Sequence, residues 1–145
     1  MSESTTEGAD KVHFELVTPA RLLATEDADM VVVPGGDGDF GVLPGHAPLL
    51  SSLRAGVVHL YDGDAIVERI FVSGGFAEVT AERCTVLAEE AVRVAEIAQD
   101  EAGQRLDAAR QRLAEADDEK DRKQAELDVN SAEIMVAAAK EHGGG

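Results

Sequence analysis

The sequence predicts a two-part protein of the β + α class, with an N-terminal β-sandwich followed by a C-terminal antiparallel two-helix hairpin. Short runs of β-branched residues, separated by turn signals about every ten residues, fill the first two thirds of the chain. After about residue 97, glycine and proline nearly vanish until the terminal Gly143–Gly145. In that last part, apolar residues recur at alternating steps of four and three, the spacing of one face of a helix.

The predicted organisation has four parts: a disordered N-terminus (1–10), a β-sandwich domain (11–95), a helical hairpin (96–141) and a flexible tail (142–145). The predicted strands are, in order, Lys11–Val17, Arg21–Ala24, Ala28–Val33, Gly56–Tyr61, Ala65–Val72, Phe76–Thr80 and Arg83–Ala88. The stretch GDFGVLPGHAPLL, residues 38–50, is too interrupted for a helix and too rich in proline for a central strand. We therefore interpret it as a stiff loop.

Each predicted helix carries one apolar stripe suited to pairing with the other. The stripes are Ala102, Leu106, Ala109, Leu113 and Ala116 in the first helix, and Ala125, Val129, Ala132, Val136 and Ala139 in the second. Asp117 or Asp118 is suited to cap the second helix. Because the stripes are mostly alanine, they bury little apolar area, and Gly103 weakens the first helix further. The hairpin is thus predicted to be a marginal element.

The second helix has another apolar stripe on its opposite face, formed by Leu127, Ile134 and Ala138. A two-helix hairpin needs only one stripe per helix. The second stripe either packs on the protein's own sandwich or meets another protein in some states, and the sequence leaves both interpretations open.

Charge and composition restrict the partners of the chain. The formal net charge is −16, apolar residues make up 44% of the chain and aromatic residues 3%. Nucleic-acid binding is not expected, because it needs basic residues to replace counterions. An anionic membrane surface would repel the chain, and no apolar run is long enough to span a membrane, so no direct lipid insertion is expected. A protein partner should offer basic or apolar surface.

No catalytic, cofactor-binding or metal site is predicted. Asp39-Phe40-Gly41 matches one kinase motif, but the chain is too short for the others. Asp37-Gly38-Asp39 resembles the start of a calcium loop, but the twelfth position is Pro48 where an acid is needed. Cys84, the single cysteine, lies in a strand-like run and is expected to be buried and inert.

Several segments resemble the epsilon subunit of the bacterial ATP synthase, the counterpart of the mitochondrial delta subunit. They are GVLPGHAPL at residues 41–49, GVV at 56–58, VSGGFAEV at 72–79 and TVLAE at 85–89. The likeness runs in this order from about Val12 to the end of the chain. That family has an N-terminal β-sandwich and a C-terminal pair of helices, in agreement with the fold predicted from the residues.

The resemblance implies a non-catalytic subunit of the central stalk that couples rotation of the gamma subunit to the c-ring. It places the protein peripherally, on the cytoplasmic face of the bacterial inner membrane. The implied contact residues for the c-ring and gamma are Asp39, Phe40, Val42, Pro44, Gly45, His46, Ala47 and Pro48. Asp39 occupies the position where relatives commonly carry a Glu that approaches the ring. His46 either braces this loop by a hydrogen bond or contacts a partner directly.

The nucleotide site of many relatives is not carried over, so no cofactor is expected. Their motif opens with an aliphatic residue, Asp, two variable residues, Arg and Ala, whereas Ile97–Ala102 reads IAQDEA. In relatives that inhibit ATP hydrolysis, the hairpin inserts among the alpha and beta subunits with help from positive charge. After residue 121 the bases are few, namely Arg122, Lys123 and Lys140, which predicts weak regulation. The alternative function is a free-standing acidic adaptor or chaperone-like binding module.

Overall fold

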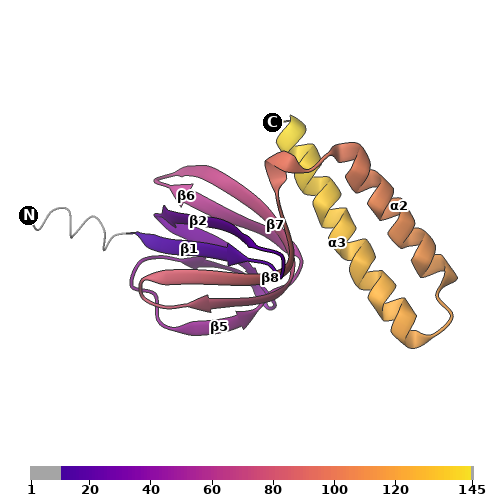
Figure 1. The fold of residues 1–145 in the computed structure, drawn as a ribbon, viewed down its shortest axis with the longest axis horizontal. Coiled ribbons are helices and arrows are strands. Elements are labelled where there is room, and N and C mark those ends of the chain that lie inside the picture. Colours follow the sequence, from indigo (N-terminus) through magenta and orange to yellow (C-terminus); the bar gives the residue numbers. More distant parts are fainter. Residues whose placement is uncertain (1–10, 145) are drawn as a thin grey trace, which may run out of the picture. The chain divides into compact units, whose positions relative to one another are not determined.

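The computed structural model describes residues 11–144, and the chain divides into two compact units between Ala91 and Val92. The predicted fold class is confirmed, since a β-sandwich is followed by two antiparallel helices (Figure 1). The predicted disordered N-terminus, residues 1–10, lies outside the described residues. The division falls four residues before the predicted domain end at 95, because the segment after Ala91 packs with the helices: Val94 is buried, and Val92 and Met135 line the same pocket.

The strands of the described residues form one eight-stranded sheet that is folded into two layers. Its order is β2-β1-β8-β7-β6-β3-β4, and β5 pairs with β7. The pairing of β1 with β8 is parallel, and β1 with β2 is antiparallel. The strands are β1 (Val12–Val17), β2 (Leu22–Ala28), β3 (Met30–Gly35), β4 (Gly38–Val42), β5 (Leu49–Ser52), β6 (Gly56–Asp62), β7 (Ala65–Val79) and β8 (Arg83–Arg93).

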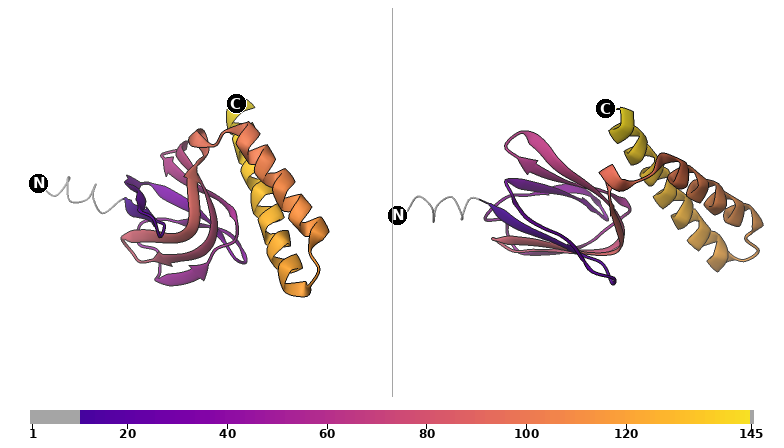
Figure 2. Two further views of the ribbon diagram at one scale, coloured as in Figure 1. Left: turned by 45° about the vertical axis from the view of Figure 1, so that its right-hand side comes forward. Right: turned by 45° about the horizontal axis from the view of Figure 1, so that its top comes forward.

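Strand β7 belongs to both layers of the sandwich (Figure 2). Its first half pairs with β6 and its last four residues pair with β5. Between them Gly74 and Gly75 have φ of +65° and +113°, which bends the strand. A Cβ atom on Gly75 would lie 1.9 Å from the carbonyl oxygen of Leu87. The prediction of two separate strands here is therefore wrong, because the glycines bend the backbone without ending the strand.

Side chains that alternate along the strands fill the space between the layers. In β1, for example, Val12, Phe14 and Leu16 are buried and the residues between them are partly exposed. The main core cluster is aliphatic apart from Phe14 and Cys84, and Phe71 of β7 is completely buried outside that cluster. The cluster consists mainly of Val12, Phe14, Leu16, Val31, Val33, Val42, Val58, Leu60, Ile70, Val72, Val79, Cys84 and Val86.

The stretch at residues 38–50 contains two strands, β4 and β5, that the loop interpretation missed. Neither strand contains a proline, because Pro44 and Pro48 both fall in the connection between them. Strand β4 lies at one edge of the sheet, and β5 pairs only with β7. Prolines are tolerated next to strands in such edge positions. The prolines therefore mark the connection and do not exclude strands on either side of it.

The helical unit contains a short 3-10 helix, η1 (Val94–Glu96), followed by α2 (Gln99–Glu115) and α3 (Glu119–Gly144). Asp118 caps α3, since its Oδ1 accepts a hydrogen bond from the backbone N–H of Asp121 at 2.8 Å. The predicted tail at 142–145 is wrong for residues 142–144, because α3 continues through them. No proline interrupts the helical hydrogen bonds before that point.

The two helices meet through small residues and are joined by ion pairs. The residues of the predicted stripes that are buried are Ala102, Leu106, Ala109, Ala125, Ala132 and Ala139. Arg110 approaches Glu133 and Arg112 approaches Asp128, each with an N–O distance of 3.6 Å. The predicted pairing of the stripes is thus present, and charged pairs on its margin fix the register of the antiparallel helices.

Two glycine substitutions are expected to have opposite effects on stability. Gly75→Ala should destabilise the sandwich by roughly 3 kcal/mol or more, because its positive φ and the Leu87 carbonyl both exclude a Cβ atom. Gly103→Ala should stabilise the helical unit by up to about 1 kcal/mol, since a Cβ there meets no atom within 4 Å. Hydrogen exchange resolved by residue would report each unit separately. If Gly75→Ala left the stability of the sandwich unchanged, the role assigned to the bend would be contradicted.

Candidate partner-binding surface

The connection between β4 and β5, residues 43–48, is held in place by hydrogen bonds. The N–H of Gly45 donates to the carbonyl oxygen of Ala81 in the β7–β8 turn at 2.7 Å, and Gly45 has a φ of +85°. The ring Nδ1 of His46 lies 2.6 Å from the carbonyl oxygen of Ala47. The bracing hydrogen bond considered for His46 is therefore present. Pro44 and His46 are half-buried, while Gly45, Ala47 and Pro48 are exposed.

Asp39 lies apart from this connection, on the part of β4 next to the β3–β4 turn. It pairs with Pro34 in the sheet, three residues before Val42, so about 10 Å of strand separates it from the end of β4. Its Oδ1 accepts a hydrogen bond from Nη2 of Arg54 at 2.6 Å, and Nη1 of Arg54 donates to the carbonyl oxygen of Gly35 at 2.6 Å. Arg54 was not predicted from the sequence, because nothing in the local pattern indicates this pairing.

Two of the predicted interface residues belong partly or wholly to the core. Val42 is completely buried within the sandwich, so its prediction as a contact residue is wrong. It faces inward because alternate residues of β4 point to opposite faces. Phe40 is half-buried and packs against the same core. The exposed part of the predicted surface consequently consists of Asp39, Gly45, Ala47 and Pro48, and Pro44 and His46 are half-buried.

The sheet also has an exposed apolar row that the sequence analysis missed. Sheet pairing places Val17 beside Leu22 on β2 and beside Leu87 on β8. The next strand, β7, contributes Phe76, and beyond it β5 contributes Leu50. The exposed fractions are 53% for Leu22, 49% for Leu87, 53% for Phe76 and 69% for Leu50. We call these four residues and Val17 the apolar row.

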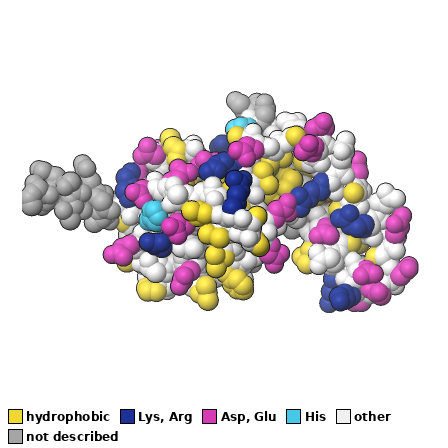
Figure 3. All heavy atoms as spheres, in the orientation of Figure 1, with side chains coloured by type: hydrophobic (Ala, Val, Ile, Leu, Met, Phe, Trp, Pro, Cys, Tyr) yellow, Lys and Arg dark blue, Asp and Glu magenta, His cyan; other side chains and the backbone are white. Residues whose placement is uncertain are grey.

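All members of the apolar row face away from the core. In β8 the inward residues are Cys84, Val86 and Ala88, so Leu87 points outward. Figure 3 shows hydrophobic side chains gathered over this part of the sandwich. A leucine out of phase with the buried residues of a strand is the sequence signal that could have indicated the row. Apolar side chains on the outward face of five neighbouring strands make the row a candidate contact surface, whereas single scattered apolar residues would not.

The predicted second stripe of α3 is only partly exposed. Leu127 is 63% exposed, whereas Ile134 and Ala138 are half-buried. The C-terminal half of α3 also packs on the segment around η1, since Met135 is 5% exposed and lines a pocket with Val92. Of the stripe proposed as an exposed contact surface, Leu127 alone is strongly exposed, and whether the stripe meets another protein stays open.

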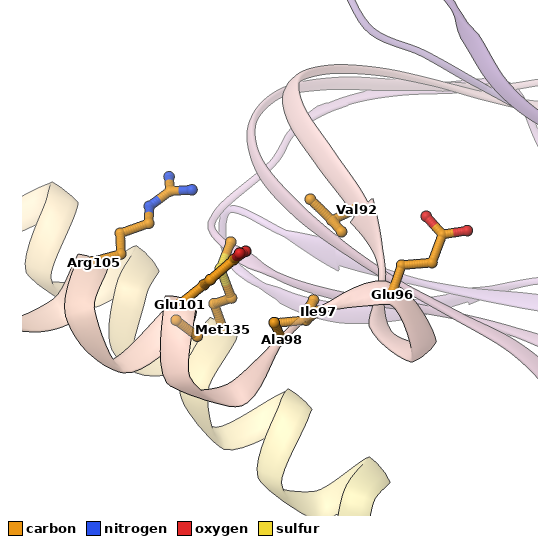
Figure 4. A pocket seen from close by; sticks show the side chains of 8 residues that line it. Val92, Glu96, Ile97, Ala98, Glu101, Arg105 and Met135 are labelled. Atoms are coloured by element: carbon orange, nitrogen blue, oxygen red, sulfur yellow. The ribbon is translucent and has the colours of Figure 1, made fainter.

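A small pocket occupies the base of the helical unit (Figure 4). It is lined by the end of β8, the residues around η1, the first turns of α2 and Met135 of α3. The lining includes Ala98 and Glu101 at the two positions where the nucleotide motif of relatives has Asp and Arg. The pocket has a volume of about 200 Å³, below the roughly 300–1,000 Å³ typical of ligand pockets.

No feature of residues 11–144 indicates a metal site or a membrane span. Across these residues, no three His, Cys, Asp or Glu side chains form a group that could hold a metal ion. Within the same range, neither α2 nor α3 combines the length and hydrophobicity required to cross a bilayer.

Comparison with known proteins identifies the family. A sequence model described as "ATP synthase, Delta/Epsilon chain, beta-sandwich domain" matches residues 11–94. The chain belongs to the ATP synthase delta/epsilon family. The resemblance predicted from the sequence motifs is thereby confirmed, and the matched segment ends before α2, so the helical pair is not part of this match.

Curated relatives of this epsilon-family chain share the same segment. The ATP synthase epsilon chain of Rhodospirillum rubrum is 63% identical over 83 residues, covering 57% of this chain and 62% of the relative. That of Paramagnetospirillum magneticum is 56% identical over 86 residues, covering 59% of this chain and 65% of the relative. The chain thus spans less than two thirds of the length of these relatives.

Solved structures resemble the fold over a longer stretch. A chain in the Euglena gracilis mitochondrial ATP synthase, solved as OSCP/F1/c-ring in rotational state 1, has a TM-score of 0.74 and 26% identity, covering 89% of this chain and 81% of that chain. A chain from the Tetrahymena thermophila mitochondrial ATP synthase central stalk/c-ring has a TM-score of 0.61 and 14% identity, covering 89% of this chain and 96% of that chain. The second likeness shows the fold alone.

Cys84 is expected to resist thiol reagents in the native protein. It is completely buried, and burial raises the pKa of its thiol to about 12, so almost no thiolate forms at neutral pH. Alkylation followed by mass spectrometry should show labelling in denaturant and almost none in buffer at pH 8. Rapid labelling of the folded chain would mean that the strand β8 opens readily.

Proposed function

We propose that this chain is a non-catalytic central-stalk subunit of a proton-translocating ATP synthase, which couples rotation of the gamma subunit to the c-ring. The observation that carries the proposal is the apolar row on a sandwich that matches the delta/epsilon family. An isolated subunit would leave these leucines and the phenylalanine in water, whereas a partner with an apolar surface would bury them. The Euglena chain that resembles this one comes from a structure of OSCP, F1 and the c-ring. This supports gamma and the c-ring as partners.

The gamma subunit is the proposed partner of the apolar row. Burying a leucine or phenylalanine side chain contributes roughly 1.5–3 kcal/mol, so four such residues suffice for a specific contact once the costs of association are subtracted. The formal net charge of −16 favours a partner with basic residues around an apolar centre. Together these two features suit a stable subunit contact better than the transient contacts of an adaptor.

The c-ring is the proposed partner of the 43–48 connection and of Asp39. Pro44 and Pro48 restrict the backbone of the connection, and its hydrogen bond to Ala81 ties it to the neighbouring turn. A contact that transmits torque must resist deformation. The two prolines and the hydrogen bond to Ala81 both restrain this connection. The proposed location is peripheral, on the cytoplasmic face of the bacterial inner membrane.

The helical pair is proposed to regulate ATP hydrolysis only weakly, through contacts with the alpha and beta subunits. Arg110 and Arg112 already form ion pairs with α3, so fewer bases remain for a partner. The second helix offers one strongly exposed apolar residue, Leu127. This helix can therefore contribute little hydrophobic or electrostatic binding to a catalytic interface.

Substitutions in the apolar row should weaken assembly without unfolding the chain. We expect the double variant Leu50→Ser, Leu87→Thr to bind gamma at least tenfold more weakly, a loss of roughly 1.4 kcal/mol or more, because both side chains would be buried by the partner. Affinity can be measured by co-purification and titration with gamma. The native chain should co-purify with the complex as a single copy.

Val67→Thr is the matched control, because Val67 is also 53% exposed and lies on β7 outside the row. It should bind like the native chain. If the double variant and the native chain had equal affinity for gamma, the assignment of the apolar row to gamma would be wrong. Failure to co-purify with any ATP synthase subunit would favour the adaptor function instead.

The isolated chain is expected not to bind ATP in the physiological millimolar range. The pocket at the base of the helices is lined by two carboxylates, Glu96 and Glu101, and one base, Arg105, so its net charge repels phosphates, and Ala98 cannot replace a polar ligand. Isothermal titration calorimetry with ATP should give no saturable heat. A dissociation constant below about 0.1 mM, roughly −5.5 kcal/mol, would contradict this expectation.

A further inference from the structure

A polar network crosses three strands on the same outward face as the apolar row. His13 on β1 lies between two carboxylates: its Nδ1 is 2.9 Å from Oδ1 of Asp27 on β2, and its Nε2 is 3.3 Å from Oε2 of Glu15. Nη1 of Arg83 on β8 donates to Oε1 of Glu15 at 3.2 Å. The hydroxyl of Thr25 on β2 is 3.4 Å from Nε2 of His13. The network therefore joins β2, β1 and β8.

The network and the apolar row follow each other along β1. His13, Glu15 and Val17 are alternate residues, so their side chains leave the same face at steps of about 6.6 Å. Strand β2, which carries Leu22 of the row, pairs only with β1 and forms the edge of the sheet. The polar contacts from β2 to His13 are thus side-chain links between this edge strand and the rest of the layer.

Protonation of His13 changes both the strength of this link and the charge of the face. The hydrogen bond with Asp27, followed by that with Glu15, raises the pKa of His13 above its ordinary value of 6.5. Asp27 faces the ring from β2, Glu15 from β1 and Arg83 from β8, and Lys11 pairs with Asp29 beyond them. Protonated His13 and Arg83 together balance the charges of Asp27 and Glu15, whereas neutral His13 leaves one negative charge in excess within this group of four.

We propose that protonated His13 holds the edge strand β2 against β1, so that Leu22 keeps its place in the apolar row, which we also call the docking face. We call this proton-dependent contact the latch. The inference rests on the proposed function of the apolar row as the gamma contact. A protonated imidazole makes charge-assisted hydrogen bonds to Asp27 and Glu15, and a neutral one makes weaker bonds. Because the folded-state pKa is raised, the contribution is fully present below pH 6.5 and is lost as pH rises through that higher value.

Hydrogen exchange of the full chain at pH 6 and pH 8.5 tests the latch without any partner. After correction for the intrinsic rates, β2 amides should exchange about two- to fivefold faster at pH 8.5, the change expected from losing one exposed ion pair. Amides of β6 should show no such change. NMR titration should give His13 a pKa above 6.5 that falls in an Asp27→Asn variant.

His13→Gln should remove the pH dependence of β2 exchange, because glutamine keeps a donor but does not titrate. His142→Gln is the matched control, since His142 is exposed on α3, and it should leave the dependence unchanged. Equal β2 protection at both pH values in the native chain, or a dependence that persists in His13→Gln, would overturn the latch.

The same variants separate the latch from the assignment of gamma. Affinity of the native chain for gamma should fall about two- to fivefold between pH 6 and pH 8.5, and that of His13→Gln should change less. If β2 exchange follows pH as expected but gamma binds at neither pH, the proposed partner is wrong and the latch stands. If gamma binds equally at both pH values while β2 loosens, the latch does not control the docking face.

Discussion

One strand, β7, lies in both layers of the sandwich, and it can do so because Gly74 and Gly75 turn the backbone where a side chain would collide with Leu87. The first half of the strand builds one layer with β6, and its end builds the other with β5 and β8. The aliphatic core lies between these two halves. Without the bend, the inward residues before and after it could not face one another across a single core.

The same bend positions the outward face. Because Gly75 has no side chain, β7 and β8 approach closely enough for Phe76 and Leu87 to take part in one row. The row is a surface feature that the folding of a sandwich does not require, since the core is complete without it. An exposed apolar row lowers solubility, and the high net negative charge of the chain, −16, offsets this. That combination agrees with the proposed function as a subunit of a larger complex.

The helical pair is stabilised by different means. Its interface consists mostly of alanine, which allows the helices to approach closely but contributes little hydrophobic free energy. Ser131 of α3 is buried with its hydroxyl lacking a hydrogen-bond partner, which lowers the stability of the folded helix further. The ion pairs of Arg110 and Arg112 specify register and contribute little stability, as exposed pairs generally do. These properties suit an element that opens at a lower free energy than the sandwich.

The sequence by itself determined the fold class, the helical stripes, the burial of Cys84 and the family, because each depends on local periodicity or on a contiguous motif. Tertiary structure decided which parts of the predicted site could meet a partner. Val42 turned inward because the segment around it became a strand, and Asp39 was separated from the 43–48 connection by that same strand. The partnership of Arg54 with Asp39, the apolar row and the His13 network all join residues far apart in sequence. Strand pairing creates such neighbours, and periodicity within one strand carries no information about what lies on the next.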